Sequence, residues 1–111
     1  MFIKIYSYHI KSDKLQDYLE IQEEADRIYS IYTDSKILHL QSKDDETKWV
    51  EIQIYKTEQF YYETIQIIDQ QPEIQVLYKR FLEVIISHEE ISEDNYQLID
   101  IKGGKQDWGL R

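Results

Sequence analysis

The sequence predicts an α+β domain whose elements follow the order β-α-β-β-α-β. Apolar and polar residues alternate in residues 2–10, 36–56 and 96–102, which is typical of strands. Apolar residues recur at helical spacing in residues 11–32 and 57–85. Strands and helices in this order predict a four-stranded antiparallel sheet with the helices on one face.

The first strand and the first helix follow directly from these patterns. Within residues 2–8 the aliphatic side chains Ile3 and Ile5 lie at odd positions, and the aromatic ones, Phe2, Tyr6 and Tyr8, lie at even positions. Residues 11–32 then change to helical spacing, with one stripe formed by Leu15, Tyr18, Gln22, Ala25 and Tyr29. Ser12 or Asp13 is expected to cap this helix, and Asp13 with Gln16 forms a plausible capping box.

Residues 36–56 predict a hairpin with the acidic loop KDDET. If the turn is centred on Asp45, the numbers of facing residues add to 90, so that His39 faces Glu51 and Leu40 faces Val50. A shift by one residue would mix the two faces of the sheet, so the predicted parity is secure.

The second half contains a broken helix and a last strand. Thr57 is expected to cap a helix that Pro72 interrupts, because proline suits the first turn of a new helix. Residues 87–95 are polar and predict a connection, and residues 96–102 predict the final strand. Residues 1–102 therefore form one domain, and residues 103–111 form a tail whose Trp108 is expected to lie against protein or to be disordered.

The two faces of the predicted sheet differ in character. One is aliphatic, with Ile3, Ile5, Leu38, Leu40, Val50, Ile52, Ile54, Ile99 and Ile101; the other mixes aromatic and polar groups, with Tyr6, Tyr8, Ile37, His39, Trp49, Glu51, Tyr55, Tyr96 and Leu98. We expect the helices to cover the aliphatic face. The mixed face would then be a large exposed patch, so we expect a second copy of the chain to cover it.

Composition excludes several classes of function. The 111 residues include 13 basic and 22 acidic residues, a formal charge of −9, which disfavours nucleic acid and anionic membranes as partners. There is no cysteine, and no long apolar run or signal peptide is evident, so we expect a cytoplasmic domain. The three histidines form no metal motif, and phosphate-loop and dinucleotide motifs are absent, so no metal or cofactor is expected.

The mixed face carries the candidate site. A carboxylate beside an imidazole orients one ring nitrogen and raises the pKa of the imidazole. His39 and Glu51 are therefore the candidate catalytic pair. The alternative is a structural ion pair in a dimer interface. Tyr6, Tyr8, Trp49 and Tyr55 are the candidate substrate-binding residues, and the alternative for them is packing.

The segments IKSDKLQDYLE, VEIQIYKTEQFYYETIQ and QQPEI complete a pattern that resembles a known family. Together they resemble the ferredoxin-like, dimeric α/β-barrel superfamily, and within it the antibiotic-biosynthesis-monooxygenase-like domains. The resemblance implies a homodimer in which two sheets pack face to face. The haem-degrading branch has a tryptophan and a histidine in the second helix. This chain has Thr64 near the first of these positions and no histidine in residues 57–80, so haem degradation is disfavoured.

Two functions agree with this interpretation. The resemblance implies a cofactor-independent monooxygenase-like enzyme that acts on a hydrophobic or aromatic small molecule. The alternative is a non-catalytic, dimeric ligand-binding or stress-associated protein of the same fold, because a fold by itself does not fix an activity. An open cavity that holds a histidine, tyrosine or tryptophan would favour the enzyme.

Overall fold

The computed structural model describes residues 1–103 and places the expected elements in the expected order. The elements are β1 (Phe2–His9), η1 (Ser12–Lys14), α1 (Leu15–Tyr32), β2 (Lys36–Gln41), β3 (Lys48–Tyr55), α2 (Glu58–Asp69), α3 (Pro72–Val84), η2 (His88–Glu90) and β4 (Ser92–Gln97). The predicted position of Trp108 in the tail lies outside the described residues.

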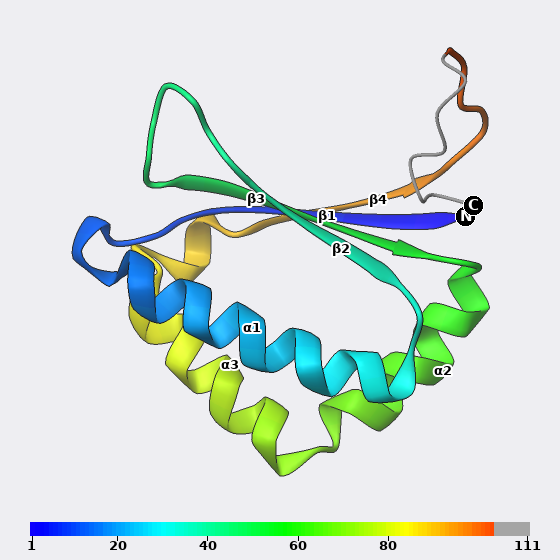
Figure 1. Cartoon of the computed structure of the whole chain (residues 1–111), viewed down its shortest axis with the longest axis horizontal. Coiled ribbons are helices and arrows are strands. Elements are labelled where there is room, and N and C mark those ends of the chain that lie inside the picture. Colours follow the sequence, from blue (N-terminus) through cyan, green and yellow to red (C-terminus); the bar gives the residue numbers. More distant parts are fainter. Residues whose placement is uncertain (104–111) are drawn as a thin grey trace.

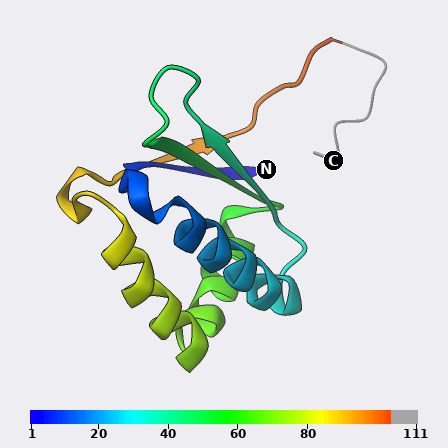
Figure 2. The same ribbon diagram turned by 60° about the vertical axis from the view of Figure 1, so that its left-hand side comes forward.

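The strands form one antiparallel sheet in the order β2-β3-β1-β4, and α1, α2 and α3 lie on a single face of it (Figures 1 and 2). This arrangement confirms the predicted α+β, ferredoxin-like fold. The long helix α1 crosses beneath the sheet beside α3 (Figure 1). Helix α2 lies at the end of the sheet where the chain leaves β3. The helices and the sheet therefore form two layers.

The hairpin between β2 and β3 has the predicted register. Leu40 faces Val50, Leu38 faces Ile52, and His39 faces Glu51. The loop is held by Asp45, whose carboxylate accepts hydrogen bonds from both the backbone and the hydroxyl of Thr47. The alternation of apolar residues and a turn centred on Asp45 were therefore sufficient to predict which residues face each other.

The helix ends agree with the prediction in the second half of the chain and differ in the first. The Thr57 hydroxyl accepts a hydrogen bond from the Phe60 backbone N–H at 3.0 Å, and Pro72 opens α3. Ser12 and Asp13 do not cap α1. They lie within η1, and α1 begins after Lys14 without a side-chain cap.

The last strand lies earlier than predicted, at Ser92–Gln97 instead of residues 96–102. Its residues are all exposed, and they pair with β1 through the backbone, with Glu93 facing Tyr6 and Tyr96 facing Ile3. The reason is that an edge strand needs neither apolar alternation nor burial, so the apolar pattern at Ile99 and Ile101 was a poor guide.

The prediction of which face meets the helices was wrong. The aromatic and polar face lies against the helices: Tyr8 packs on Tyr18 and Phe81, and Trp49 packs on Tyr18 at 4.9 Å between ring centroids. His39 also points toward α1, so its predicted position away from the helices is wrong, although its pairing with Glu51 is correct. Both faces are largely apolar, and the helices present aromatic partners to the aromatic one.

The opposite face, here called the outer face, is the aliphatic one. Its apolar residues are Ile3, Ile5, Leu38, Leu40, Val50, Ile52, Ile54 and Tyr96, and its polar residues, Ser7, Lys36, Ser92 and Asp94, lie toward its edges. None of the described helices covers it (Figure 1). Leu38, Leu40 and Tyr96 keep 40%, 47% and 52% of their surface exposed, so the outer face is a hydrophobic surface of this chain.

The cap of α2 gives a direct test of the fold. Replacing Thr57 with alanine should lower the free energy of unfolding by about 1 kcal/mol, because the Phe60 N–H loses its acceptor. Thr57→Ser keeps a hydroxyl and should stay close to the wild-type value. Urea unfolding followed by circular dichroism measures both variants, and equal stabilities would contradict the role of the cap.

Candidate functional site

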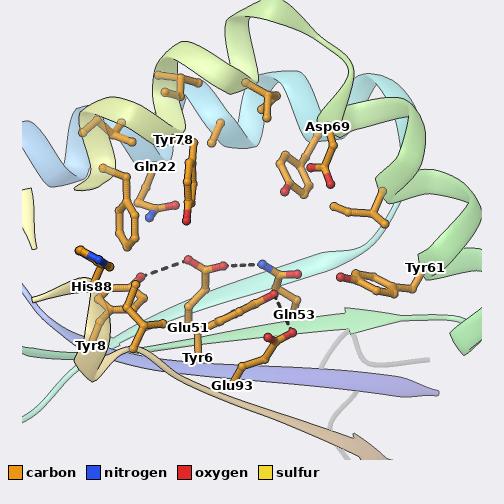
Figure 3. Close-up of a pocket in the computed structure, with 18 residues that line it drawn as sticks. Tyr6, Tyr8, Gln22, Glu51, Gln53, Tyr61, Asp69, Tyr78, His88 and Glu93 are labelled. Carbon is orange, nitrogen blue, oxygen red and sulfur yellow. Dashed lines mark hydrogen bonds between the residues drawn. The ribbon is translucent and has the colours of Figure 1, made fainter. Parts of the chain in front are cut away.

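A cavity of about 500 Å³ lies between the sheet and the helices. Figure 3 shows Glu51, Gln53 and Glu93 on the sheet side of this cavity, and Asp69 and Tyr78 on the helix side. The lining residues come from every strand except β2, from all three α-helices and from the segment before β4: Tyr6, Tyr8, Ile21, Gln22, Ala25, Tyr29, Glu51, Gln53, Tyr61, Ile65, Asp69, Ile74, Leu77, Tyr78, Phe81, His88, Ile91 and Glu93. Its size and its mixture of aromatic and polar groups are typical of a small-molecule site.

Glu51 is the buried acid of this cavity. It lies in the middle of β3 on the helix side of the sheet, and only 13% of its side chain is exposed. The Tyr8 hydroxyl donates to Glu51 Oε1 at 3.1 Å, and the Gln53 amide donates to Glu51 Oε2. A buried carboxylate needs such donors, since without them its burial would cost several kcal/mol.

His39 lies behind Glu51 and does not line the cavity. Its Nε2 is 3.0 Å from the Gln22 Oε1 atom and 3.4 Å from the Glu51 Oε1 atom. Because both partners are oxygen atoms, Nε2 is the donor. Of the predicted pair, Glu51 therefore lines the cavity, and His39 contacts it from behind while Gln22 contacts His39.

The electrostatics of the site keep the acid ionised and the phenols neutral. Burial by itself raises the pKa of Glu51, but hydrogen bonds from His39, Gln53 and Tyr8 outweigh it, so the pKa lies below its ordinary value of 4.5. Burial raises the pKa of Tyr8, and the negative charge of Glu51 raises it further. At neutral pH the site thus presents a carboxylate beside protonated hydroxyl groups.

A second polar group lies at the β4 side of the cavity. The Lys4 ammonium forms an ion pair with Glu93 and donates to Asn95 Oδ1 at 2.8 Å. It also lies over the rings of Tyr61 and Tyr6, at 4.8 Å and 5.7 Å from their centroids. Lys4 is nearly buried, and burial lowers its pKa, but the contacts with Glu93 outweigh this effect and the pKa is raised.

The predicted binding residues divide into two groups. Tyr6 and Tyr8 line the cavity, whereas Trp49 and Tyr55 lie in the core and are not among its lining residues. Trp49 packs against α1, and the Tyr55 hydroxyl donates to Gln53 Oε1 at 2.7 Å. Packing, the alternative that the sequence left open, is therefore the observed role of these two rings.

Several lining residues were not among the candidate site residues chosen from the sequence. They include Gln53, Asp69 and the helix residues Gln22, Tyr29 and Tyr78. The signal for α1 was available, because its stripe contains a glutamine and two tyrosines where an ordinary core helix has aliphatic residues. Alternation along β3 places Gln53 on the same face as Glu51, whereas Asp69 carried no signal, since its position depends on how α2 lies on the sheet.

Residues 1–103 contain no group of three histidine, cysteine, aspartate or glutamate side chains arranged to hold a metal ion. Among the helices of this part of the chain, none has both the length and the apolar composition that crossing a membrane requires.

Known structures share this fold. A putative antibiotic biosynthesis monooxygenase from Nitrosomonas europaea matches with a TM-score of 0.71 and 17% identity, over 90% of this chain and all of its own. An uncharacterized NIPSNAP domain protein from Burkholderia xenovorans matches with a TM-score of 0.74 and 15% identity, over 94% and 100%. SnoaB, a cofactor-independent oxygenase from Streptomyces nogalater, matches with a TM-score of 0.72 and 6% identity, over 90% and 94%.

No protein-family model matches the sequence, and the comparison with curated proteins also gives no match. The solved structures nonetheless confirm the predicted fold of the antibiotic-biosynthesis-monooxygenase-like proteins. The NIPSNAP structures share it too, so one fold carries proteins described as oxygenases and proteins without a described activity.

The lowered pKa of Glu51 predicts a difference in acid stability. Its folded pKa lies below the unfolded value, so its ionised form stabilises the fold above the unfolded pKa, and this contribution is lost as the pH falls through the folded pKa. Between about pH 5 and about pH 3, the free energy of unfolding should therefore fall less steeply in Glu51→Gln than in the wild type.

Urea unfolding at several pH values measures this slope. Glu23→Gln, an exposed change of the same kind on α1, is the matched control and should keep the wild-type slope. Parallel profiles for all three proteins would show that the Glu51 contacts do not stabilise the folded state.

Proposed function

We propose that this protein binds a hydrophobic or aromatic small molecule in the cavity between sheet and helices and acts on it as a cofactor-independent, oxygenase-like enzyme. The observation that carries the proposal is the ionised Glu51 carboxylate at the floor of a cavity whose walls include six aromatic rings. The rings bind a planar apolar molecule, and the Glu51 carboxylate is held rigidly by its hydrogen bonds and is able to accept a proton.

In the proposed reaction Glu51 accepts a proton from an acidic C–H next to an aromatic ring. The resulting carbanion transfers electrons to O₂, which is both the oxidant and the source of the new oxygen atom. Oxidation of a ring CH₂ to C=O consumes one O₂: one oxygen atom enters the carbonyl, and the other leaves as water with the two hydrogens. His39 acts as a positioning residue, because it contacts Glu51 without lining the cavity, and Gln22 in turn contacts His39.

The second candidate function is a non-catalytic ligand-binding protein of the same fold. The observation that favours it is the low pKa of Glu51, because a carboxylate stabilised by three donors is a weak base. In that case the same cavity selects a ligand, and Glu51 orients it through a hydrogen bond.

Anthrone, a tricyclic aromatic ketone with an acidic CH₂, distinguishes the two functions. If the protein is an oxygenase, it should accelerate O₂ consumption in an oxygen electrode without any added cofactor, and Glu51→Gln should reduce the rate above background at least about 100-fold. Glu23→Gln is the matched control and should keep the wild-type rate.

Calorimetric binding of the same compound separates the outcomes. Binding without O₂ consumption by the wild-type protein would support the non-catalytic function. A fully active Glu51→Gln variant would contradict the role of Glu51, and the absence of both binding and turnover would contradict the choice of an aromatic ligand.

We further propose that the chain forms a homodimer through the outer face. The sequence predicted a dimer through the sheet face that points away from the helices. The proposed interface is still that face, but the residues on it are mainly aliphatic and not, as predicted, aromatic. Support comes from the exposed Leu38, Leu40 and Tyr96, which make a flat apolar surface on a chain that is otherwise strongly acidic. A second copy presents the same surface, so the contact is isologous, and the residues at its centre, Ile5, Val50 and Ile52, carry no charge.

A charge in the middle of the outer face should dissociate the dimer. Ile52→Glu places an unpaired carboxylate in the interface, which costs several kcal/mol there. Val76→Glu adds the same charge at a position of α3 that is 57% exposed, and it should leave the dimer intact. Light scattering at micromolar concentration measures the mass, and a monomeric wild type or identical behaviour of the two variants would contradict the proposal.

A further inference from the structure

The cavity is acidic. Among its described lining residues, Glu51, Asp69 and Glu93 are acidic, and none is lysine or arginine. Glu51 and Glu93 both have close partners, which are described above. Asp69 differs from them, because no hydrogen bond or ion pair joins its carboxylate to any part of residues 1–103.

Asp69 also occupies an unfavourable place for an anion. It is the last residue of α2, where the helix dipole is negative, and the last turn of α2 contains no basic residue. The N-terminus of α3 follows at Pro72, but none of its backbone N–H groups is hydrogen-bonded to the Asp69 carboxylate. Desolvation beside the cavity raises the pKa of Asp69. The Asp69 side chain remains exposed at the edge of the cavity, where water solvates it. A positive charge in the cavity would stabilise the carboxylate further, and no lysine or arginine of residues 1–103 forms an ion pair with it.

The Glu93 end of the cavity shows how this protein binds a positive charge. There the Lys4 ammonium pairs with Glu93 and lies over the rings of Tyr61 and Tyr6. A carboxylate and aromatic faces together bind an ammonium group by charge and by cation–π attraction. The Asp69 end has similar components, because Tyr29 lines the cavity near enough for the charge of Asp69 to raise its pKa, but among residues 1–103 no lysine or arginine forms an ion pair with Asp69.

We propose that the cavity selects molecules with a positively charged amino group on a hydrophobic or aromatic body, and that Asp69 binds the ammonium. The body lies against the rings and the apolar side chains of α1 and α3, above Glu51. The inference rests on the proposed binding of a small molecule in the cavity and names its chemical class. Anionic aromatic compounds are excluded, because three carboxylates face them without a free cation.

Three naphthalene compounds that differ in one group test this selectivity. They are 1-naphthylmethylamine, which is cationic at neutral pH, the neutral 1-naphthalenemethanol and the anionic 1-naphthoate. Titration calorimetry should show the amine binding to the wild-type protein at least about tenfold more tightly than the alcohol, and the naphthoate should not bind.

Two variants of equal charge locate the effect. Asp69→Asn should reduce the ratio of amine to alcohol affinity to near one and leave the alcohol affinity within about twofold. Asp26→Asn, an exposed change on α1 outside the cavity lining, should retain the wild-type ratio. Ala25→Trp fills the cavity and should abolish binding of both compounds.

The outcomes separate this inference from the proposed function. Equal binding of amine and alcohol, or an unchanged ratio in Asp69→Asn, would overturn the selectivity and leave the cavity as an aromatic ligand site. If no compound binds, or if Ala25→Trp still binds them, small-molecule binding in this cavity fails, and the selectivity fails with it.

Discussion

The burial of one carboxylate organises the inner side of this protein. Glu51 lies between the sheet and the helices, where an unpaired charge would be strongly destabilising. Its donors come from β1, β2 and β3, through Tyr8, His39 and Gln53. Each donor is held in turn by another group: the hydroxyl of Tyr8 lies 2.7 Å from that of Tyr18, His39 contacts Gln22, and Gln53 accepts from Tyr55. The network therefore fixes α1 on the sheet.

This polar network also explains why a cavity exists there. Phenol and amide groups must keep their hydrogen-bonding geometry, so they cannot collapse as aliphatic side chains do. The helices of the cavity bring further phenols, and α2 and α3 meet at a break beside the cavity. The outer face has the opposite character: its aliphatic residues are regular in shape and need no partner atoms, which suits close contact with another flat surface.

The comparison with known structures separates the fold from the site. A sheet order and a helix arrangement are shared with the oxygenase SnoaB at only 6% identity, so very different residues satisfy the same backbone. The cavity residues of this chain must therefore be judged by their own contacts. Their acidic balance, with Asp69 uncompensated among the described residues, is the feature that bears most directly on the choice of ligand.

The sequence by itself determined the order of elements, the register of the β2–β3 hairpin, the break at Pro72 and the pairing of His39 with Glu51. These features depend on local rules, namely the two-residue period of a strand, the turn around Asp45 and the restricted backbone of proline. Only the tertiary structure decided which face of the sheet meets the helices, where β4 begins and which side chains enclose the cavity. Alternation assigns residues to two faces, but it cannot say which face meets the helices when both contain many apolar residues. That outcome depends on packing against Tyr18 and Phe81, which are distant in sequence from β3.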